Sequence, residues 1–227
     1  MKHKKYHLIY FFSLLFFILS LVSTTTAQTS YLDSLDGKYA LQFQISEDFT
    51  LTNFQGATLS GKYHLGTRSA LRMGLSLNFD NSSRDLEASL LDTMNYNETA
   101  ETNSFGFLIS SQYLNYLVGT ADIGFYLGIG PAIGFSHSKM EFNSEISDST
   151  IQDGSGTGES FTVGLDAIVG VEWSFHKDMT LSAEYGIKFY YTHQTEKFES
   201  TSRKDERTIE AFRITANYVN FGISVYF

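Results

Sequence analysis

The sequence of 227 residues contains no cysteine and a single proline, Pro131. Without cysteine the chain has no disulfide framework, no thiolate metal site and no lipid anchor attached through a cysteine. Positive charge is also scarce, because 16 lysine and arginine residues face 25 carboxylates and the net charge is −9. An acidic chain without a basic patch is a poor nucleic-acid binder. Stability must therefore come from the packing and pairing of the chain itself, and we expect no nucleic-acid partner.

Long apolar runs are missing after residue 27. Before that point, three lysines within the first five residues precede an apolar run over 8–22, and small residues at 25–27 follow it. This order is typical of a secretory signal peptide cleaved after Ala27. The alternative is an uncleaved anchor helix, but the run is shorter than the ~20 residues that a membrane span needs. We therefore expect export, a signal peptide at 1–27 and a mature domain at 28–227 whose net charge, without the three lysines, is −12.

Apolar and polar residues alternate about eight times along the mature chain, which predicts strands with two different faces. The predicted strands lie at 39–46, 57–65, 71–79, 104–116, 124–138, 162–175, 181–191 and 211–227. Short turns are predicted at 66–68, 119–120 and 176–178, and long polar connections at 47–54, 80–103, 139–160 and 193–210. Short turns at one end and long loops at the other are typical of an up-and-down outer-membrane barrel.

The strand at 124–138, "GFYLGIGPAIGFSHS", places its glycines on one face and its large apolar residues on the other. Glycine weakens a strand unless other groups need the space beside it. We interpret the glycine face as the lining of a narrow lumen, with room for longer side chains such as Tyr126. Because Pro131 removes one backbone donor, we also predict a local bulge or bend there.

Alternation alone does not tell whether the apolar face points to a soluble core or outward to lipid. Two features favour lipid. The last strand alternates apolar residues up to an aromatic end, through Val219, Phe221, Ile223, Val225 and Phe227. Aromatic residues on the apolar face also gather near the strand ends, as amphipathic rings do at the two interfaces of a bilayer. They are Tyr39, Tyr63, Trp173, Phe175 and Phe227 near the short turns, and Phe79, Phe105, Phe135, Phe161 and Tyr191 toward the long loops.

With its signal peptide, the "GIGP" strand, "GVEWSF" followed by "LSAEYG", and the terminal phenylalanine, the chain resembles the small outer-membrane β-barrel family, including the membrane domain of OmpA and OmpX-like proteins. The resemblance implies an all-β fold, a closed antiparallel eight-stranded transmembrane up-and-down barrel. Ten strands or a soluble barrel are the alternatives. It also implies that barrel-assembly machinery reads the last strand, and we expect a monomer in outer-membrane lipid.

If the apolar faces meet lipid, the opposite faces bring charges into the lumen. These charges are Lys62, Arg72, Asp122, Asp166, Glu172, Glu184 and Lys188. An eight-stranded barrel is only wide enough for its own side chains, and buried charges persist only when they are paired or hydrated. We therefore predict a lumenal ion-pair network that plugs the barrel.

The favoured function is a structural or interaction role through acidic extracellular loops, with a partner that the sequence does not identify. A narrow channel for small solutes or ions is the alternative.

A lipid A-modifying enzyme is the third hypothesis, and it depends on Ser136, His137 and Ser138. Both serines adjoin the histidine on one strand and point to the opposite face, so we expect no enzyme. The sequence shows no phosphate-binding loop and no zinc or calcium spacing, so no cofactor or metal is expected, and "DGSGTGES" at 153–160 is interpreted as a flexible loop.

Overall fold

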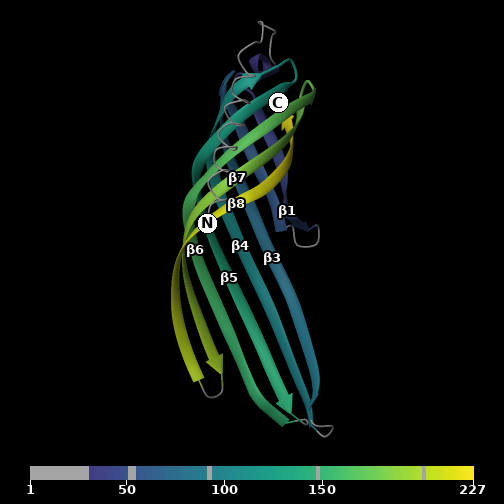
Figure 1. The fold of residues 1–227 in the computed structure, drawn as a ribbon, viewed down its shortest axis with the longest axis vertical. Helices are drawn as coiled ribbons and strands as arrows, with labels where there is room; N and C mark the ends of the chain where they lie inside the picture. Colours follow the sequence, from purple (N-terminus) through teal and green to yellow (C-terminus); the bar gives the residue numbers. More distant parts are fainter. Residues whose placement is uncertain (1–30, 51–54, 91–93, 147–148, 201–202) are drawn as a thin grey trace, which may run out of the picture.

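The structure is a computed structural model that describes residues 31–50, 55–90, 94–146, 149–200 and 203–227. The predicted signal peptide at 1–27 lies outside the described residues. The described strands form a closed barrel in which each strand is antiparallel to the next and the last pairs with the first (Figure 1). The strands are β1 (Tyr39–Thr50), β2 (Gln55–Gly66), β3 (Ser69–Leu90), β4 (Met94–Gly119), β5 (Ile123–Ile146), β6 (Ser149–His176), β7 (Met179–Ser200) and β8 (Arg203–Tyr226). The prediction of a closed antiparallel eight-stranded barrel is confirmed.

The two ends of the barrel differ. At one end, here called the turn end, β2 and β3, β4 and β5, and β6 and β7 are joined by only two or three residues, as predicted. At the other end, here called the extended end, the strands from β3 to β8 continue beyond the β1–β2 hairpin (Figure 1). The last β2–β3 pair toward the extended end is Thr58 with Ser76, and beyond it β3 is paired only with β4.

The predicted long loops are wrong over most of their length, because the structure continues the strands through them. Residues 80–90 pair with 94–104 without interruption, and 153–160 belongs to β6. Backbone hydrogen bonds hold a hairpin in water even where both faces are polar, so the apolar alternation ends before the strand does. The glycine-rich part of β6 has a packing role: the Phe142 ring lies where a Cβ of Gly154 would be, and it stacks on Phe198 with ring centroids 5.3 Å apart. Aromatic rings that cover glycines in this way pin the register of a sheet.

Of the bulge or bend predicted at Pro131, the bulge is absent. The pairing register of β5 is the same on both sides of the proline, and Pro131 pairs normally with Leu165 on β6. On the β4 side, the two pairs that Gly130 and Pro131 would form with Gln112 and Ser111 are missing from the ladder. The missing N–H of Pro131 therefore interrupts the pairing of β5 with β4, and no residue is inserted. The backbones of the two strands approach closely here, which only glycine allows, because a Cβ on Gly130 would lie 1.7 Å from the Ser111 carbonyl oxygen.

The outer face of the barrel is apolar. Large hydrophobic side chains on alternate positions of the strands are exposed, among them Leu71, Leu127, Val169 and Phe221. Aromatic residues lie together near both ends of this surface. Near the turn end the rings of Tyr39 and Tyr63 stack at 4.6 Å, and Trp173 lies 5.9 Å from Phe175. Toward the extended end Phe79 lies 5.1 Å from Phe105, and Phe107 lies 6.2 Å from Phe135.

A bulge in β8 keeps this outer face continuous. Gly186 pairs with Tyr218 and Ile187 pairs with Ala216, so Asn217 is an extra residue. A single extra residue reverses the parity of a strand. For this reason Phe212 and Ile214 at even positions are exposed on the outer face, and so are Phe221, Ile223, Val225 and Phe227 at odd positions, while Val219 is half-buried.

The segment before β1 covers the turn end. The short 3-10 helix η1 (Tyr31–Ser34) buries Leu32, and the following Leu35 is buried beside it against lumenal residues. Gly37 has φ +74°, a left-handed conformation that favours glycine, and this turn leads the chain into β1. None of the described helices is long and apolar enough to cross a membrane.

Candidate functional site: a lumen closed by buried ion pairs

The first buried cluster lies near the turn end, around Glu172 of β6. Lys62 of β2 donates to both carboxylate oxygens, at 2.9 and 3.1 Å. Three hydroxyl groups complete the set, donated by Tyr116 at 2.6 Å, Thr180 at 2.5 Å and Tyr226 at 2.8 Å. Lys62 and Glu172 are 1% and 0% exposed, so this is a fully desolvated ion pair whose carboxylate is saturated with donors.

The second cluster lies one step closer to the extended end and is built on Arg72 of β3. Its guanidinium meets both oxygens of Glu184 on β7, one of them at 3.0 Å. The remaining donors bind Gln112, at 2.9 Å from Nε, and Gln42, at 3.1 Å. The Tyr126 hydroxyl donates to Glu184 at 2.5 Å. A two-pronged arginine–carboxylate pair of this kind fixes both partners in one orientation.

Both ion pairs cross the bore. In the closed ring of strands, β6 lies opposite β2 and β7 lies opposite β3. Lys62 therefore reaches Glu172 across the lumen, and Arg72 reaches Glu184 in the same way. The glycine face of β5 gives these side chains their space, as predicted for Tyr126: its ring is fully buried and occupies the position that a Cβ on Gly170 would need. The two clusters fill the cross-section of the barrel.

Of the other three charges predicted in the lumen, Asp166 and Lys188 lie inside the barrel and Asp122 does not. Asp166 is buried and accepts a hydrogen bond from Tyr190 at 2.7 Å, and its partner across the ladder is Lys188. Asp122 is a correction: it lies in the turn between β4 and β5, and it is exposed. Its backbone carbonyl accepts from the Ser174 N–H at 2.7 Å. The parity of β5 does not extend into the turn, because the ladder begins only at Ile123.

Sequence reasoning missed the uncharged members of the network: Gln42, Gln112, Tyr116, Thr180 and Tyr226. All of them stand at the same alternate positions as the polar residues of their strands, so the alternation could have placed them in the lumen. The sequence pattern places Tyr39, Tyr63 and Tyr191 at the lipid interfaces, yet a buried tyrosine also supplies a hydroxyl donor to a carboxylate. Tyr31 behaves differently. Its hydroxyl is buried with no hydrogen-bond partner among the described residues, and burial, aided by the charge of Glu172, raises the pKa of Tyr31 well above its ordinary value.

Beyond the two clusters, the lumen opens into a cavity of 580 Å³ toward the extended end, here called the vestibule. Side chains of every strand line it, and most of them are serine, threonine, asparagine or glycine. Several hydroxyl groups bond to each other across strands: Thr58 to Ser76 at 2.6 Å, and Ser136 to Ser160 at 2.8 Å. The only charged side chains among the described lining residues are Lys188 and Arg213.

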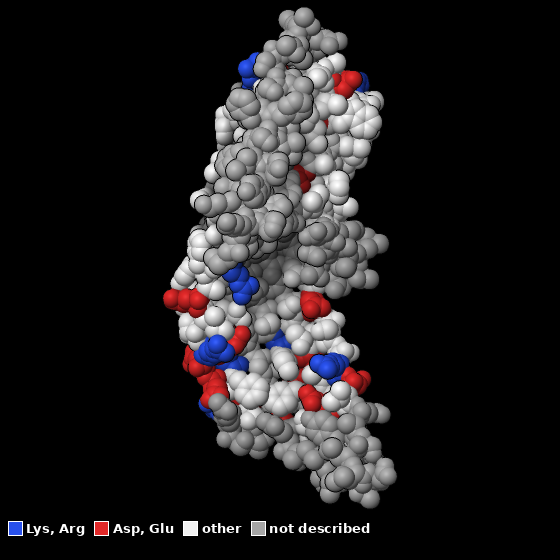
Figure 2. Space-filling view, viewed as in Figure 1, with Lys and Arg blue, Asp and Glu red and all other residues white. Residues whose placement is uncertain are grey.

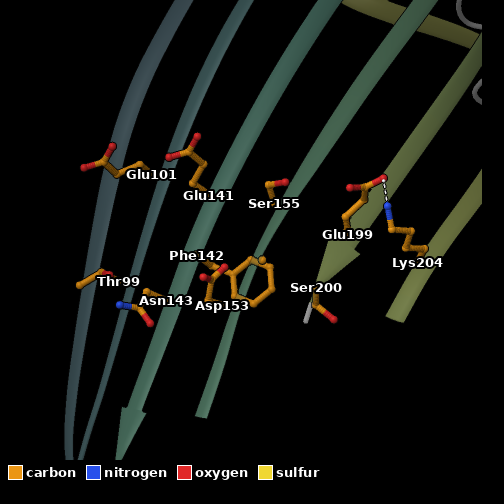
Figure 3. A pocket seen from close by; sticks show the side chains of 11 residues that line it. Thr99, Glu101, Glu141, Phe142, Asn143, Asp153, Ser155, Glu199, Ser200 and Lys204 are labelled. Atoms are coloured by element: carbon orange, nitrogen blue, oxygen red, sulfur yellow. Dashed lines mark hydrogen bonds and ion pairs between the residues drawn. The ribbon is translucent and has the colours of Figure 1, made fainter. Parts of the chain in front are cut away.

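The extended end carries a second, more open hollow of 720 Å³ (Figure 3). One row of cross-strand partners runs along it: Glu101, Glu141, Ser155, Glu199 and Lys204. Lys204 forms an ion pair with Glu199 at 3.0 Å, and Glu101 lies directly opposite Glu141 (Figure 3). Most of the charged side chains visible in Figure 2 lie toward this end, at the bottom of the view. Within the described ranges, no group of three or more His, Cys, Asp or Glu side chains is arranged to hold a metal ion.

The serine and histidine residues at 136–138 do not form a catalytic pair. The Ser136 hydroxyl faces the inside and bonds to Ser160, whereas His137 is on the outer face, exposed, with Nδ1 3.7 Å from Glu159. A nucleophile and its base must share one hydrogen bond. This arrangement offers none between the histidine and its neighbouring serine.

No protein-family model and no curated protein matches the chain. Several solved structures resemble its fold at low sequence identity. A major outer membrane protein from Thermus thermophilus is 14% identical, with a TM-score of 0.45, over 84% of this chain and 98% of that one. CarO2 of Acinetobacter baumannii is 9% identical, with a TM-score of 0.42, over 84% of this chain and 98% of that one. Ail, the attachment invasion locus protein of Yersinia pestis, is 14% identical, with a TM-score of 0.31, over 85% of this chain and 99% of that one.

Proposed function

We propose that the chain spans a bacterial outer membrane as a plugged barrel and acts as a structural or interaction protein through its extended end. The turn end then faces the periplasm and the extended end faces the outside. The apolar outer surface between two sets of aromatic residues supports this placement, since a water-soluble barrel would expose polar residues there. From the turn end up to the Thr58–Ser76 and Ser46–Asn220 pairs, the ring is closed and both edges of each strand are paired, as hydrocarbon requires.

The observation that carries the plugged lumen is the pair of ion pairs across the bore, Lys62 with Glu172 and Arg72 with Glu184. They are fully desolvated and are surrounded by tyrosine, glutamine and threonine side chains that take up the remaining hydrogen bonds. Leu32 and Leu35 cover the same region from the turn end. A solute would have to break both ion pairs at once to pass, so we expect no steady conduction.

The interaction role rests on the extended end. Its strands project beyond the aromatic residues that lie toward the extended end, and its outer face carries the acidic row of Glu101, Glu141 and Glu199. These carboxylates share strand parity with Phe105, Phe135 and Tyr191 of the outer face, so they point away from the vestibule. A paired, acidic, outward-facing sheet is a surface for partners in the envelope or outside the cell.

Two measurements test the proposal. The protein should fractionate with outer membranes and change its mobility on a denaturing gel after heating, as a stable barrel does, and recovery in the soluble periplasm would refute the membrane placement. In planar bilayers the purified protein should give no reproducible single-channel steps. Stepwise conductance in the unmodified protein would favour the narrow channel instead. The comparison is a protein with both Arg72→Ala and Glu184→Ala, which lacks one of the two crossing ion pairs. This variant should conduct more than the unmodified protein.

A further inference from the structure

The vestibule has the opposite charge to the rest of the chain. The sequence has a net charge of −9, and the exposed sheet around the extended end is acidic. Yet the charged side chains among the described lining residues of the vestibule are both cations, Lys188 and Arg213. The two ion pairs close this cavity on the side of the turn end, so a ligand cannot enter it from the turn end.

The two cations lie on one wall. Arg213 of β8 is the cross-strand partner of Tyr190, and Lys188 lies two residues from Tyr190 on β7, opposite Thr215. Lys188 and Arg213 are therefore diagonal neighbours on the inner face, at a spacing of about 7–8 Å between backbones. The bulge at Asn217 is what turns Arg213 inward, because it reverses the parity of β8 above that point.

The carboxylate of Asp166 offsets only one of the two positive charges of Lys188 and Arg213. Asp166 is the ladder partner of Lys188 and offsets its charge, and it also accepts the Tyr190 hydroxyl at 2.7 Å. Arg213 forms no ion pair with any carboxylate in the part of the chain that the structure describes. An anion bound between Lys188 and Arg213 would accept charge-assisted hydrogen bonds from both and balance the remaining positive charge.

The rest of the vestibule lining, here called the hydroxyl wall, is suited to a hydroxylated molecule. The hydroxyl groups of Ser76, Ser136, Thr162 and Thr192 and the amide of Asn220 face the same space. Hydroxyl and amide groups both donate and accept hydrogen bonds, so they match sugar hydroxyls. The volume of 580 Å³ lies within the range of small-molecule sites, about 300–1,000 Å³.

From this geometry we propose that the vestibule binds a small hydroxylated anion, of the class of sugar phosphates or sugar acids, with Lys188 and Arg213 holding the anionic group and the hydroxyl wall holding the sugar. The inference goes beyond the proposed function and is independent of membrane conduction. A barrel that conducts would refute the plug and leave this site untouched.

The test is isothermal titration of the detergent-solubilised protein with glucose 6-phosphate, glucose and inorganic phosphate. Glucose 6-phosphate should bind saturably and more tightly than either of the others. Arg213→Gln should weaken it at least about tenfold, the typical loss when a charged hydrogen-bond donor is removed. Lys188→Gln should also weaken it. Heat-dependent gel mobility establishes that each variant is folded.

Lys204→Gln is the matched control, since Lys204 belongs to the outer acidic row and pairs with Glu199. It should bind glucose 6-phosphate like the unmodified protein. No saturable binding to the unmodified protein, equal binding of glucose and glucose 6-phosphate, or an equal loss in Lys204→Gln overturns the proposal. Phosphate binding as tight as that of glucose 6-phosphate overturns the role of the hydroxyl wall.

Discussion

Lys62 and Arg72 are direct cross-strand partners on β2 and β3, so two cations stand side by side on one wall of the lumen. Like charges opposite each other destabilise a sheet. They are tolerated because each reaches a carboxylate on the opposite wall, Glu172 for Lys62 and Glu184 for Arg72. The four side chains hold the two halves of the ring together across the bore.

The Arg72–Glu184 pair should be strongly coupled. Arg72→Ala or Glu184→Ala alone leaves one buried charge without its partner, which typically destabilises a protein by about 3–5 kcal/mol. The double variant should lose less than the sum, because it leaves neither charge behind. Urea unfolding of the refolded barrel measures all three. Lys177→Ala, at an exposed pair with Asp178 3.7 Å away, is the control and should change stability by less than about 1 kcal/mol. Additive losses in the double variant would contradict a structural network.

Tyr31→Phe should leave stability unchanged or raise it. The Tyr31 hydroxyl is buried without a hydrogen-bond partner among the described residues, and an unsatisfied buried polar group destabilises the fold by about 1–3 kcal/mol. Phenylalanine keeps the ring and removes that group. Tyr116→Phe is the contrast, because the Tyr116 hydroxyl donates to Glu172 at 2.6 Å, so its loss should lower the midpoint of urea unfolding. A lower midpoint for Tyr31→Phe would mean that its hydroxyl has a stabilising partner.

Gly130→Ala should impair folding severely. A Cβ at this position would lie 1.7 Å from the backbone oxygen of Ser111, which a rotamer change does not relieve. Overpacking typically destabilises by about 1–3 kcal/mol where side chains can adjust, and here backbone must move. Gly61→Ala is the matched control, since nothing lies within 4 Å of its Cβ position. The yield of heat-modifiable barrel measures both, and a normal yield for Gly130→Ala would show that β4 and β5 separate there.

The barrel could be predicted from the sequence because outward-facing apolar residues alternate with lumen-facing residues along its central strands. Lys62, Arg72, Glu172 and Glu184 all stand on the polar parity, and the structure brings all four together. The sequence could not predict which of them pair across the ring. The alternation shows which face of a strand a residue occupies, but not its position along the barrel axis. That position depends on the register of every ladder in between.

The extended end could not be predicted for a different reason. In the extended end, beyond the aromatic residues of the outer face, both faces of the strands are polar. Selection no longer imposes alternation there, and backbone pairing alone maintains the strands. Asp122 and Arg213 show the same limit at single residues. A turn removes the first from the lumen, and the bulge at Asn217 turns the second into it.

Phe227 should matter for assembly more than for the folded barrel. It is 74% exposed, and its backbone N–H donates to the Tyr39 carbonyl at 2.9 Å, so its side chain adds little packing. If assembly machinery reads the last strand, Phe227→Ala should lower the amount of barrel inserted in cells while refolding into detergent proceeds normally. Phe212→Ala is the control, because Phe212 is similarly exposed on β8, the strand that leads to Phe227, and lies 15 residues before it. Equal insertion of Phe227→Ala and Phe212→Ala would contradict a terminal signal.

Phe142→Ala should loosen the extended end and leave the barrel intact. The Phe142 ring covers Gly154 on β6 and stacks on Phe198 of β7, so it links three strands where glycines supply no side chains of their own. Its loss should speed tryptic cleavage next to Lys197, while heat-dependent gel mobility stays unchanged. Met140→Ala is the comparison, because Met140 is a large exposed side chain two residues away on the same strand. If Phe142→Ala and Met140→Ala are cleaved equally fast, the aromatic pair does not hold these strands together and backbone pairing alone maintains the sheet.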